Sequence, residues 1–207
     1  FENSKNMLST DSTKIYDEAY NKLIELKNIP LPGKHNLSNI LAAATAAKIL
    51  GVPNSKISET ISSFKGVEHR IEKVLNINGV TYYNDSKATN VEAVKVALDS
   101  FDNTIHLILG GKDKGGDFST LLPHIKNKVN EIIAYGEAAT LIETALGDAV
   151  KLKIVFSLKD AVKTCHTRAQ PGDIVLLSPG CASFDQFKNF EERGNLFKSI
   201  VNEMARS

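Results

Sequence analysis

Four side chains that carry charge or a hydroxyl stand together where a short apolar run ends. The run GVTYYN is followed directly by Asp85, Ser86, Lys87 and, two positions later, Thr89. An acid, a cation and two hydroxyls at a strand end are typical of a loop that binds a small polar molecule, because each group can donate or accept hydrogen bonds. The simpler alternative is helix capping by Asn90 in front of VEAVKVAL, but capping leaves Lys87 unexplained.

Two further loops of this kind follow later apolar runs. LILGG is followed by KDKGGD, which contains Lys114, and VLLSPG is followed by CASFD, which contains Ser183. If the runs are parallel strands, their carboxyl ends share one edge of a sheet, so the three loops would meet there. The pattern then predicts a site for an anionic small molecule, held by Lys87, Lys114 and hydroxyls. Taken singly, KDKGGD also fits a solvated turn, and SPGCAS fits a tight turn with a buried cysteine.

The elements that would position these loops begin with a hairpin. HRIEKVLNI and VTYYND flank Asn78-Gly79, a strong two-residue turn signal. The strands TIHLILGG, EIIAYG, KIVFS and DIVLLSPG then alternate with helices expected near residues 91–101, 117–128, 137–146, 158–169 and 187–206. Near-continuous Val, Ile and Leu strands between helices are typical of an α/β fold with a Rossmann-like, mostly parallel sheet and flanking helices.

The first third of the chain has a different pattern. HNLSNILAAATAAKILGVP predicts one helix, and NSKISETISSF predicts a second that Asn54 or Ser55 begins. Residues 12–27 fit either an amphipathic helix or a small hairpin. The change of pattern divides the chain into predicted domains at residues 1–66 and 67–207.

Composition and missing motifs exclude several classes of function. The 207-residue chain has a formal net charge of +1 without a basic block, so we expect no nucleic-acid partner. No apolar run approaches the roughly 20 residues of a membrane span. Two cysteines, Cys165 and Cys181, indicate a reducing, cytoplasmic compartment, and no local histidine or acid would activate Cys181 as a nucleophile. The five histidines show no metal-ligand spacing, and neither G-x-G-x-x-G nor a Walker A loop is present.

Five segments together resemble the Mur ligase family. They are LPGKHNLSNILAA, GVEHR, YYNDSKATN, LILGGKDKGGDFS and LLSPGCASFDQFKNFEERG, and they occur in the family's order from about residue 31 to the end. Within the family, NDSKATN and SPGCASFDQFKNFEERG are most similar to the members that add D-glutamate to UDP-N-acetylmuramoyl-L-alanine. Family members run a short strand pair before LPGKHN, which favours strands in residues 12–27.

The resemblance implies an ATP-dependent amide ligase of peptidoglycan precursor synthesis. The terminal carboxylate of UDP-N-acetylmuramoyl-L-alanine is phosphorylated, and the amine of D-glutamate then attacks the acyl phosphate. Residues 1–66 would be the C-terminal tail of the central ATP-binding domain, and residues 67–207 the Rossmann-like glutamate-ligase domain. We expect a monomeric, cytoplasmic enzyme of which this chain is an inactive part, with the Mg²⁺ ligands mainly in the missing central domain.

The resemblance also assigns residues to the two small substrates. Asn36 and Asn39 would lie beside adenine, Arg70 would contact the nucleotide phosphates and Asp85 would meet the ribose. From sequence alone, Asn36 is equally well explained as a helix cap.

For D-glutamate, the resemblance places Lys87, Thr89 and Lys114 around the α-carboxylate or close to it. Ser183 and the backbone amide of Phe190 would hold the γ-carboxylate. Lys87 and Lys114 are also the expected catalytic residues.

Two alternative functions stay open at this point. One is a related ligase, either another Mur type or a folylpolyglutamate type, which shares the architecture and the His-Arg pair. The other is a non-catalytic α/β module that binds an anionic metabolite, a reading supported by the missing ATPase loop.

Overall fold

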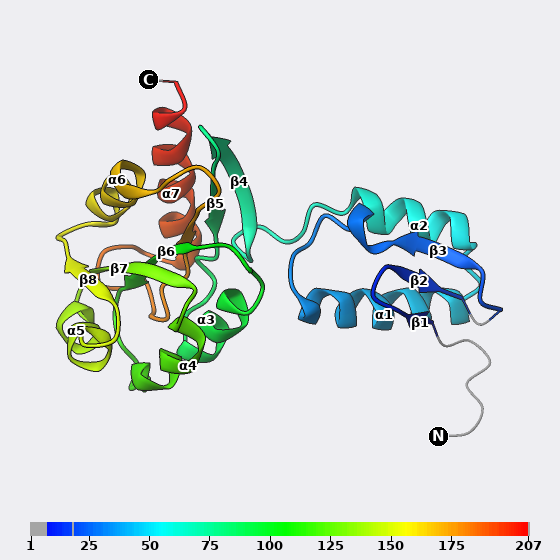
Figure 1. Ribbon diagram of the computed structural model, residues 1–207, viewed down its shortest axis with the longest axis horizontal. Coiled ribbons are helices and arrows are strands. Elements are labelled where there is room, and N and C mark those ends of the chain that lie inside the picture. The colour runs from blue at the N-terminus through cyan, green and yellow to red at the C-terminus, as the bar shows by residue number, and fades with distance from the viewer. Residues whose placement is uncertain (1–7, 18, 207) are drawn as a thin grey trace. The chain divides into compact units, whose positions relative to one another are not determined.

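The chain divides into two units, Phe1–Gly66 and Val67–Ser207, each with a hydrophobic core of its own. The computed structural model describes residues 8–17 and 19–206 (Figure 1). Residues 1–7, 18 and 207, which include the start of the first predicted domain, lie outside this description.

The first unit pairs a small antiparallel sheet with two helices. Its elements are β1 (Ser9–Thr10), β2 (Lys14–Tyr16), β3 (Lys22–Glu25), the 3-10 turn η1 (Leu26–Asn28), α1 (Lys34–Ile49) and α2 (Asn54–Ser63). Strands therefore occupy most of residues 14–25, which excludes the helical alternative there. Helix α2 begins at Asn54, and its N-cap is Pro53, which has no side-chain group to cap with. The Asn54 amide donates to Asp17 at 2.8 Å.

The second unit contains a six-stranded sheet in the order β4-β5-β9-β6-β7-β8. The strands are β4 (Glu72–Ile77), β5 (Val80–Asn84), β6 (Ile105–Gly110), β7 (Val129–Tyr135), β8 (Lys151–Ile154) and β9 (Ile174–Leu177). Only the β4–β5 pair is antiparallel, and the other four pairs are parallel. The predicted Rossmann-like α/β fold with a mostly parallel sheet is confirmed.

Local sequence explains the hairpin and the central strands. Asn78 and Gly79 have φ angles of 51° and 87°, the left-handed pair that a tight two-residue hairpin turn requires. Every residue of β6 is buried, as expected for an inner strand that is covered on both faces.

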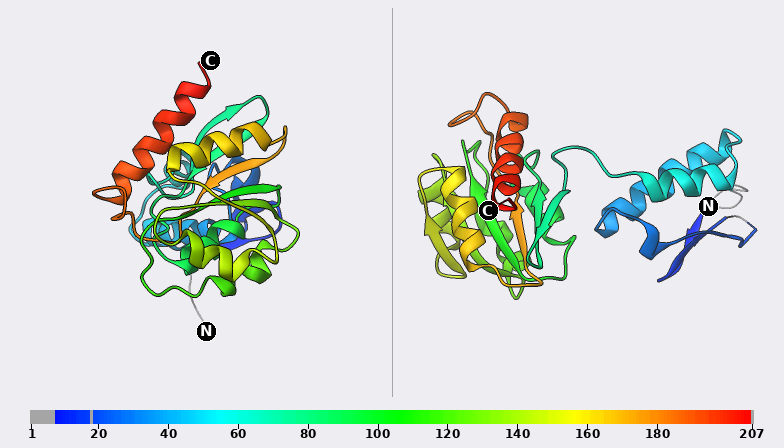
Figure 2. Two further views of the ribbon diagram at one scale, coloured as in Figure 1. Left: turned by 90° about the vertical axis from the view of Figure 1, so that its left-hand side faces the viewer. Right: turned by 90° about the horizontal axis from the view of Figure 1, so that it is seen from above.

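Helices cover both faces of the sheet (Figures 1 and 2). One face carries α3 (Val91–Leu98), the 3-10 turn η2 (Phe118–Leu121), α4 (Leu122–Ile125) and α5 (Ala139–Leu146). The other face carries α6 (Leu158–Arg168) and α7 (Phe190–Met204).

Two predicted boundaries are wrong. The helix expected over residues 117–128 is η2 followed by the single turn α4, with a proline at its start. The strand expected from KIVFS begins earlier, at Lys151, and ends at Ile154. Strand β8 lies at the edge of the sheet with three of its four residues exposed, so it lacks the apolar pattern of an inner strand.

The chain leaves β9 and its two neighbouring strands toward opposite faces of the sheet. The chain leaves β9 toward α7 on one face, whereas it leaves the neighbouring strands β5 and β6 toward α3 and η2 on the other face. Ligands of open α/β sheets bind where neighbouring strands send the chain to opposite faces.

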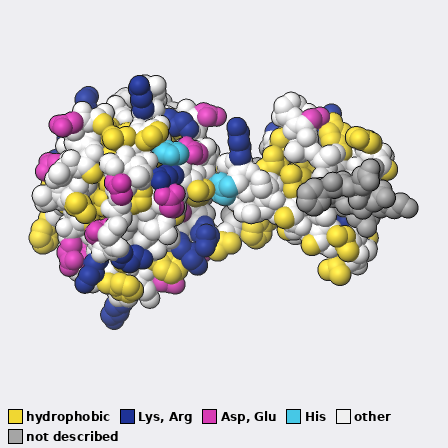
Figure 3. Space-filling view, turned by 90° about the horizontal axis from the view of Figure 1, so that it is seen from below, with side chains coloured by type: hydrophobic (Ala, Val, Ile, Leu, Met, Phe, Trp, Pro, Cys, Tyr) yellow, Lys and Arg dark blue, Asp and Glu magenta, His cyan; other side chains and the backbone are white. Residues whose placement is uncertain are grey.

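The surface is of mixed charge. On the face seen in Figure 3, cationic and anionic side chains of the second unit are intermixed. Across residues 8–17 and 19–206, no helix combines the length and the apolar character that a membrane span requires.

Candidate functional site

Three loops meet at the carboxyl ends of β5, β9 and β6. Gly180 of the β9 loop donates its N–H to the Ala88 carbonyl of the β5 loop at 2.9 Å. The β6 loop is joined to the β9 loop by a short antiparallel bridge between Lys112 and Ala182, with N–H···O distances of 2.8 and 3.0 Å. Backbone hydrogen bonds therefore hold in one place the three loops that the sequence marks as rich in polar groups.

Arg193 of α7 joins the β5 loop to the β9 loop. Its side chain is fully buried, and its guanidinium donates to the Ser86 hydroxyl at 3.0 Å, the Ser86 carbonyl at 2.7 Å and the Cys181 carbonyl at 3.1 Å. The Ser86 hydroxyl in turn donates to the Phe190 carbonyl at 2.8 Å. One buried cation thus fixes the β5 loop, the β9 loop and the first turn of α7.

Lys87 and Phe190, both predicted D-glutamate residues, lie side by side. The Lys87 ammonium lies 5.1 Å from the centroid of the Phe190 ring. The His69 and Phe190 rings form a T-shaped pair with centroids 5.9 Å apart. The His69 carbonyl accepts the Lys87 N–H at 3.1 Å. A methyl group on Gly194 would come within 2.2 Å of His69 Nδ1, so this glycine makes room for the buried imidazole.

The remaining predicted D-glutamate residues stand on the same three loops. Ser183 is buried and directly follows Ala182 of the bridge, whereas Lys114 is exposed two residues beyond Lys112. Thr89 is half-buried in the β5 loop, one residue before the N-cap of α3, where the Asn90 side chain accepts from Ala93 at 2.9 Å. The backbone N–H of Phe190 is the first of α7, and such N–H groups have no partner inside their own helix.

The predicted nucleotide residues fall in both units. In the first unit, Asn36 donates its side-chain amide to the Pro32 carbonyl at 2.6 Å, and Asn39 is exposed one turn later on α1. Asn36 is not a cap, because Gly33 is the N-cap of α1. In the second unit, Arg70 is exposed.

Asp85, predicted to meet a ribose, is already engaged within the second unit. Its carboxylate accepts from the Ser178 hydroxyl at 2.8 Å and from the Ile71 N–H at 3.2 Å. Burial raises the pKa of Asp85 to about 7, although these hydrogen bonds and the charges of Arg70 and Arg193 act in the opposite direction. Each carboxylate oxygen can accept a second hydrogen bond, so the ribose contact stays a prediction.

Sequence reasoning named Ser86 only as a possible binding group and missed Arg193, and these two residues hold the loops together. A signal for Arg193 was present, because it stands at helical spacing before the buried residues Phe197, Ile200 and Val201. A charged residue on the buried face of an amphipathic helix needs polar partners inside the fold. Nothing in the local sequence identifies those partners as the β5 and β9 loops.

Cys181 lies at this edge as a thiol. Burial raises the pKa of Cys181 to about 12, although the charges of Arg193 and Lys114 oppose that effect. A thiol in this state is a poor nucleophile at neutral pH. Within the part of the chain that the structure describes, histidine, cysteine and acidic side chains form no group of three that could hold a metal ion.

Comparison with known proteins identifies the chain. The profile of the Mur ligase glutamate ligase domain matches residues 69–181, more than half of the sequence. The chain belongs to the Mur ligase family. The resemblance predicted from the five sequence segments is confirmed.

Relatives of this Mur ligase chain carry a more specific name. It is 48% identical to UDP-N-acetylmuramoylalanine--D-glutamate ligase of Acidobacterium capsulatum over 89% of its own length and 40% of the relative. It is 46% identical to the protein of that name from Oenococcus oeni over 96% of its length and 45% of the relative. The chain therefore spans less than half the length of these curated relatives.

Solved structures share the fold at lower sequence identity. UDP-N-acetylmuramate-alanine ligase of Thermotoga maritima superposes with a TM-score of 0.69 at 14% identity, over 99% of this chain and 47% of that one. Folylpolyglutamate synthase of the same organism superposes with a TM-score of 0.63 at 16% identity, over 95% of this chain and 46% of the synthase. Mur-type and folylpolyglutamate-type ligases therefore share the architecture of this Mur ligase chain.

The raised pKa of Asp85 predicts a pH-dependent stability. The folded state holds the proton of Asp85 more tightly than the unfolded chain, whose pKa lies near 3.9. This contribution to stability is complete below about pH 4 and is lost as the pH rises toward 7, on the order of a few kcal/mol. We expect Asp85→Asn to flatten the fall in unfolding free energy over this window, measured by urea denaturation.

The matched control is Asp148→Asn, at an exposed position after α5. In this variant the unfolding free energy should fall with pH as steeply as in the wild type. A carboxyl resonance of Asp85 that titrates near pH 4 by NMR would contradict the prediction.

Proposed function

We propose that this chain is the C-terminal part of an ATP-dependent ligase that joins D-glutamate to UDP-N-acetylmuramoyl-L-alanine. Phe1–Gly66 would complete a central ATP-binding domain, and Val67–Ser207 would be the glutamate-ligase domain. The observation that carries the proposal is the meeting of three loops that bring Lys87, Lys114 and Ser183 to one edge of the sheet. The names of relatives that are 46–48% identical support D-glutamate as the amino acid.

The chemistry of this edge suits an amino acid with two carboxylates. Lys87 and Lys114 supply two ammonium groups for the α-carboxylate, with the Thr89 hydroxyl beside them. The Ser183 hydroxyl and the first N–H of α7, from Phe190, supply neutral donors for the γ-carboxylate, and the helix N-terminus adds a favourable dipole. Hydrogen bonds between charged partners each contribute about 1.5–3 kcal/mol.

Four residues are proposed for the nucleotide. Arg70 presents a planar guanidinium that matches phosphate oxygens, and Asp85 has spare lone pairs for a ribose hydroxyl. Asn36 and Asn39, three residues apart on α1, would lie beside adenine. Mg²⁺ would accompany ATP, with its ligands mainly outside this chain.

The proposed reaction has two steps. A phosphoryl group passes from ATP to the carboxylate of UDP-N-acetylmuramoyl-L-alanine, which forms an acyl phosphate. The neutral amine of D-glutamate then attacks the acyl carbon, so that a C–N bond forms, phosphate leaves and the amine gives up a proton. Lys87 and Lys114 would act by holding the amino acid in the orientation for attack and by neutralising its carboxylates.

Lys114 provides the most direct test of the D-glutamate site. In the full-length enzyme that contains this chain, Lys114→Ala should raise the KM for D-glutamate by about tenfold or more, the loss of one charged hydrogen bond. The KM for ATP should change far less, because Lys114 is assigned to the amino acid alone. Steady-state kinetics with each substrate varied in turn measure both values.

The control is Lys126→Ala, an exposed lysine just before β7 at the opposite, amino edge of the sheet. It should leave both constants unchanged. Equal increases in the two KM values for Lys114→Ala would refute the assignment.

Substitution of Arg70 should affect the KM for ATP more than the KM for D-glutamate. We expect Arg70→Ala to raise the KM for ATP by about tenfold or more, because a charged contact to phosphate is lost, with a smaller effect on D-glutamate. The same kinetic design applies, with Arg206→Ala as an exposed control near the end of α7. A larger effect on D-glutamate than on ATP would remove Arg70 from the nucleotide site.

A further inference from the structure

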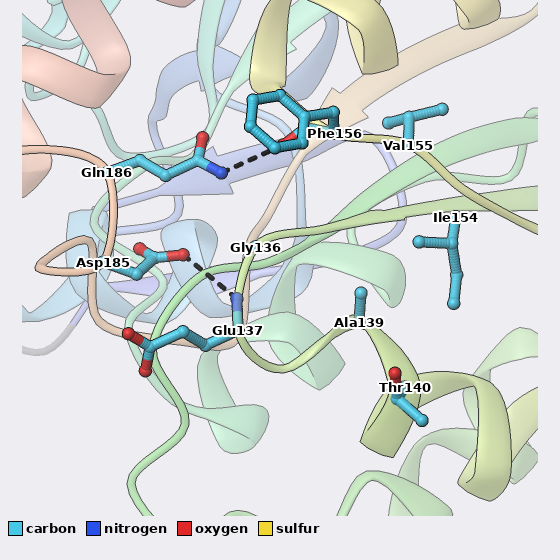
Figure 4. A pocket seen from close by; sticks show the side chains of 9 residues that line it. All are labelled: Gly136, Glu137, Ala139, Thr140, Ile154, Val155, Phe156, Asp185 and Gln186. Carbon is cyan, nitrogen blue, oxygen red and sulfur yellow. Dashed lines mark hydrogen bonds between the residues drawn. The ribbon is translucent and has the colours of Figure 1, made fainter.

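A pocket lies at the same edge of the sheet, beyond the carboxyl ends of β7 and β8. Its volume is about 550 Å³, and its walls come from the β7 loop, the β8 loop and residues 185–186 of the β9 loop (Figure 4). None of the residues proposed above for D-glutamate or for the nucleotide lines it. The pocket is therefore separate from the residues assigned to the proposed reaction.

The topology explains why a pocket forms there. From β7 the chain continues into α5, which packs on the face that α3 covers. From the neighbouring strand β8 it continues into α6, which packs on the opposite face. Adjacent parallel strands that diverge in this way leave a crevice at their carboxyl ends, the common location of ligands in open α/β sheets.

The charge of the pocket is negative. Glu137 and Asp185 contribute two carboxylates, and none of the nine lining residues is a lysine or an arginine. The Asp185 carboxylate accepts from the Glu137 N–H at 3.3 Å through one oxygen. Its other oxygen is buried and, within residues 8–17 and 19–206, has no hydrogen-bond partner. A carboxylate in this position gains from a nearby positive charge, because burial without a partner costs free energy.

An aromatic ring stands at the rim of the same pocket. Phe156 is 88% exposed, an unusual position for a large apolar side chain. Its backbone is nevertheless held, because the Gln186 side-chain amide donates to the Phe156 carbonyl at 3.0 Å. Ile154, 40% exposed, and Ala139 add apolar surface to the walls (Figure 4).

The pocket is organised before any ligand arrives. Gly136 has a φ angle of 74°, and a methyl group there would come within 2.2 Å of the Asp185 carboxylate. The absence of a side chain at Gly136 thus lets Asp185 approach the backbone of the β7 loop. A carboxylate that is held in place, as Asp185 is, loses little conformational freedom on binding.

We propose that this pocket binds an organic cation, a primary ammonium group on a short aliphatic chain. The ammonium would lie against the Asp185 carboxylate, with Glu137 as a second acid beside it, while the chain would cover Phe156, Ile154 and Ala139. Both a free aliphatic diamine and a lysine side chain of another protein have this chemistry.

NMR titration of the 207-residue chain with cadaverine tests the proposal. Saturable chemical-shift changes are expected for the amides of Glu137, Thr140, Phe156 and Gln186, with a Kd on the order of 1 mM for one charge contact and the apolar contact of the chain. Pentanediol, which has the same length without charge, should shift these amides far less. Glu137→Gln should weaken cadaverine binding about fivefold or more, and added salt should weaken it as well.

The matched control is Glu143→Gln, an exposed acid on α5 that does not line the pocket. It should leave the Kd unchanged. Titration with a blocked Gly-Lys-Gly peptide separates the two sources: tighter binding of the peptide assigns the pocket to a protein partner, and tighter binding of cadaverine assigns it to a free amine. Equal shifts with pentanediol, or the absence of saturable shifts with either amine, would overturn the proposal.

Discussion

The buried guanidinium of Arg193 is the constraint on which the carboxyl edge of the second unit depends. Placing a cation in a protein interior costs several kcal/mol unless its donors are satisfied. Arg193 meets this requirement with three neutral acceptors, two on Ser86 and one on Cys181. Because these acceptors belong to the loops after β5 and β9, satisfying the arginine also fixes the two loops and joins them to α7.

This arrangement explains how flexible side chains could act at defined positions. The loop that carries Lys87 is held through Ser86, and the loop that carries Ser183 is held through Cys181. The bridge between Lys112 and Ala182 extends the same rigidity to the loop of Lys114. An exposed lysine on a fixed backbone loses less entropy on binding an anion than one on a mobile loop. The buried Arg193 therefore holds the backbone of a site whose own cations, Lys87 and Lys114, are exposed to solvent.

Sequence patterns predicted the elements that follow from local turn residues and hydrophobic periodicity. They did not predict features that depend on contacts between residues far apart in the chain. The Asn78-Gly79 hairpin and the inner strands follow from turn chemistry and from burial on both faces. The edge strand β8 lacks that signal, so its start was misplaced. The convergence of three polar loops followed from the parallel sheet. The role of Arg193 did not, because its acceptors are 107 and 12 residues away in the chain and only the fold brings them together.

Amide hydrogen exchange in Arg193→Lys tests this account most directly. Lysine keeps the positive charge but cannot donate in three fixed directions at once. Exchange at Ser86, Lys87 and Ser183 should then accelerate by about tenfold or more, the loss of about 1.4 kcal/mol of local stability, while exchange within β6 stays as in the wild type. Arg206→Lys, at an exposed position near the end of α7, should change none of these rates. Unchanged exchange at the three loop residues in Arg193→Lys would contradict the claim that this one side chain holds the site together.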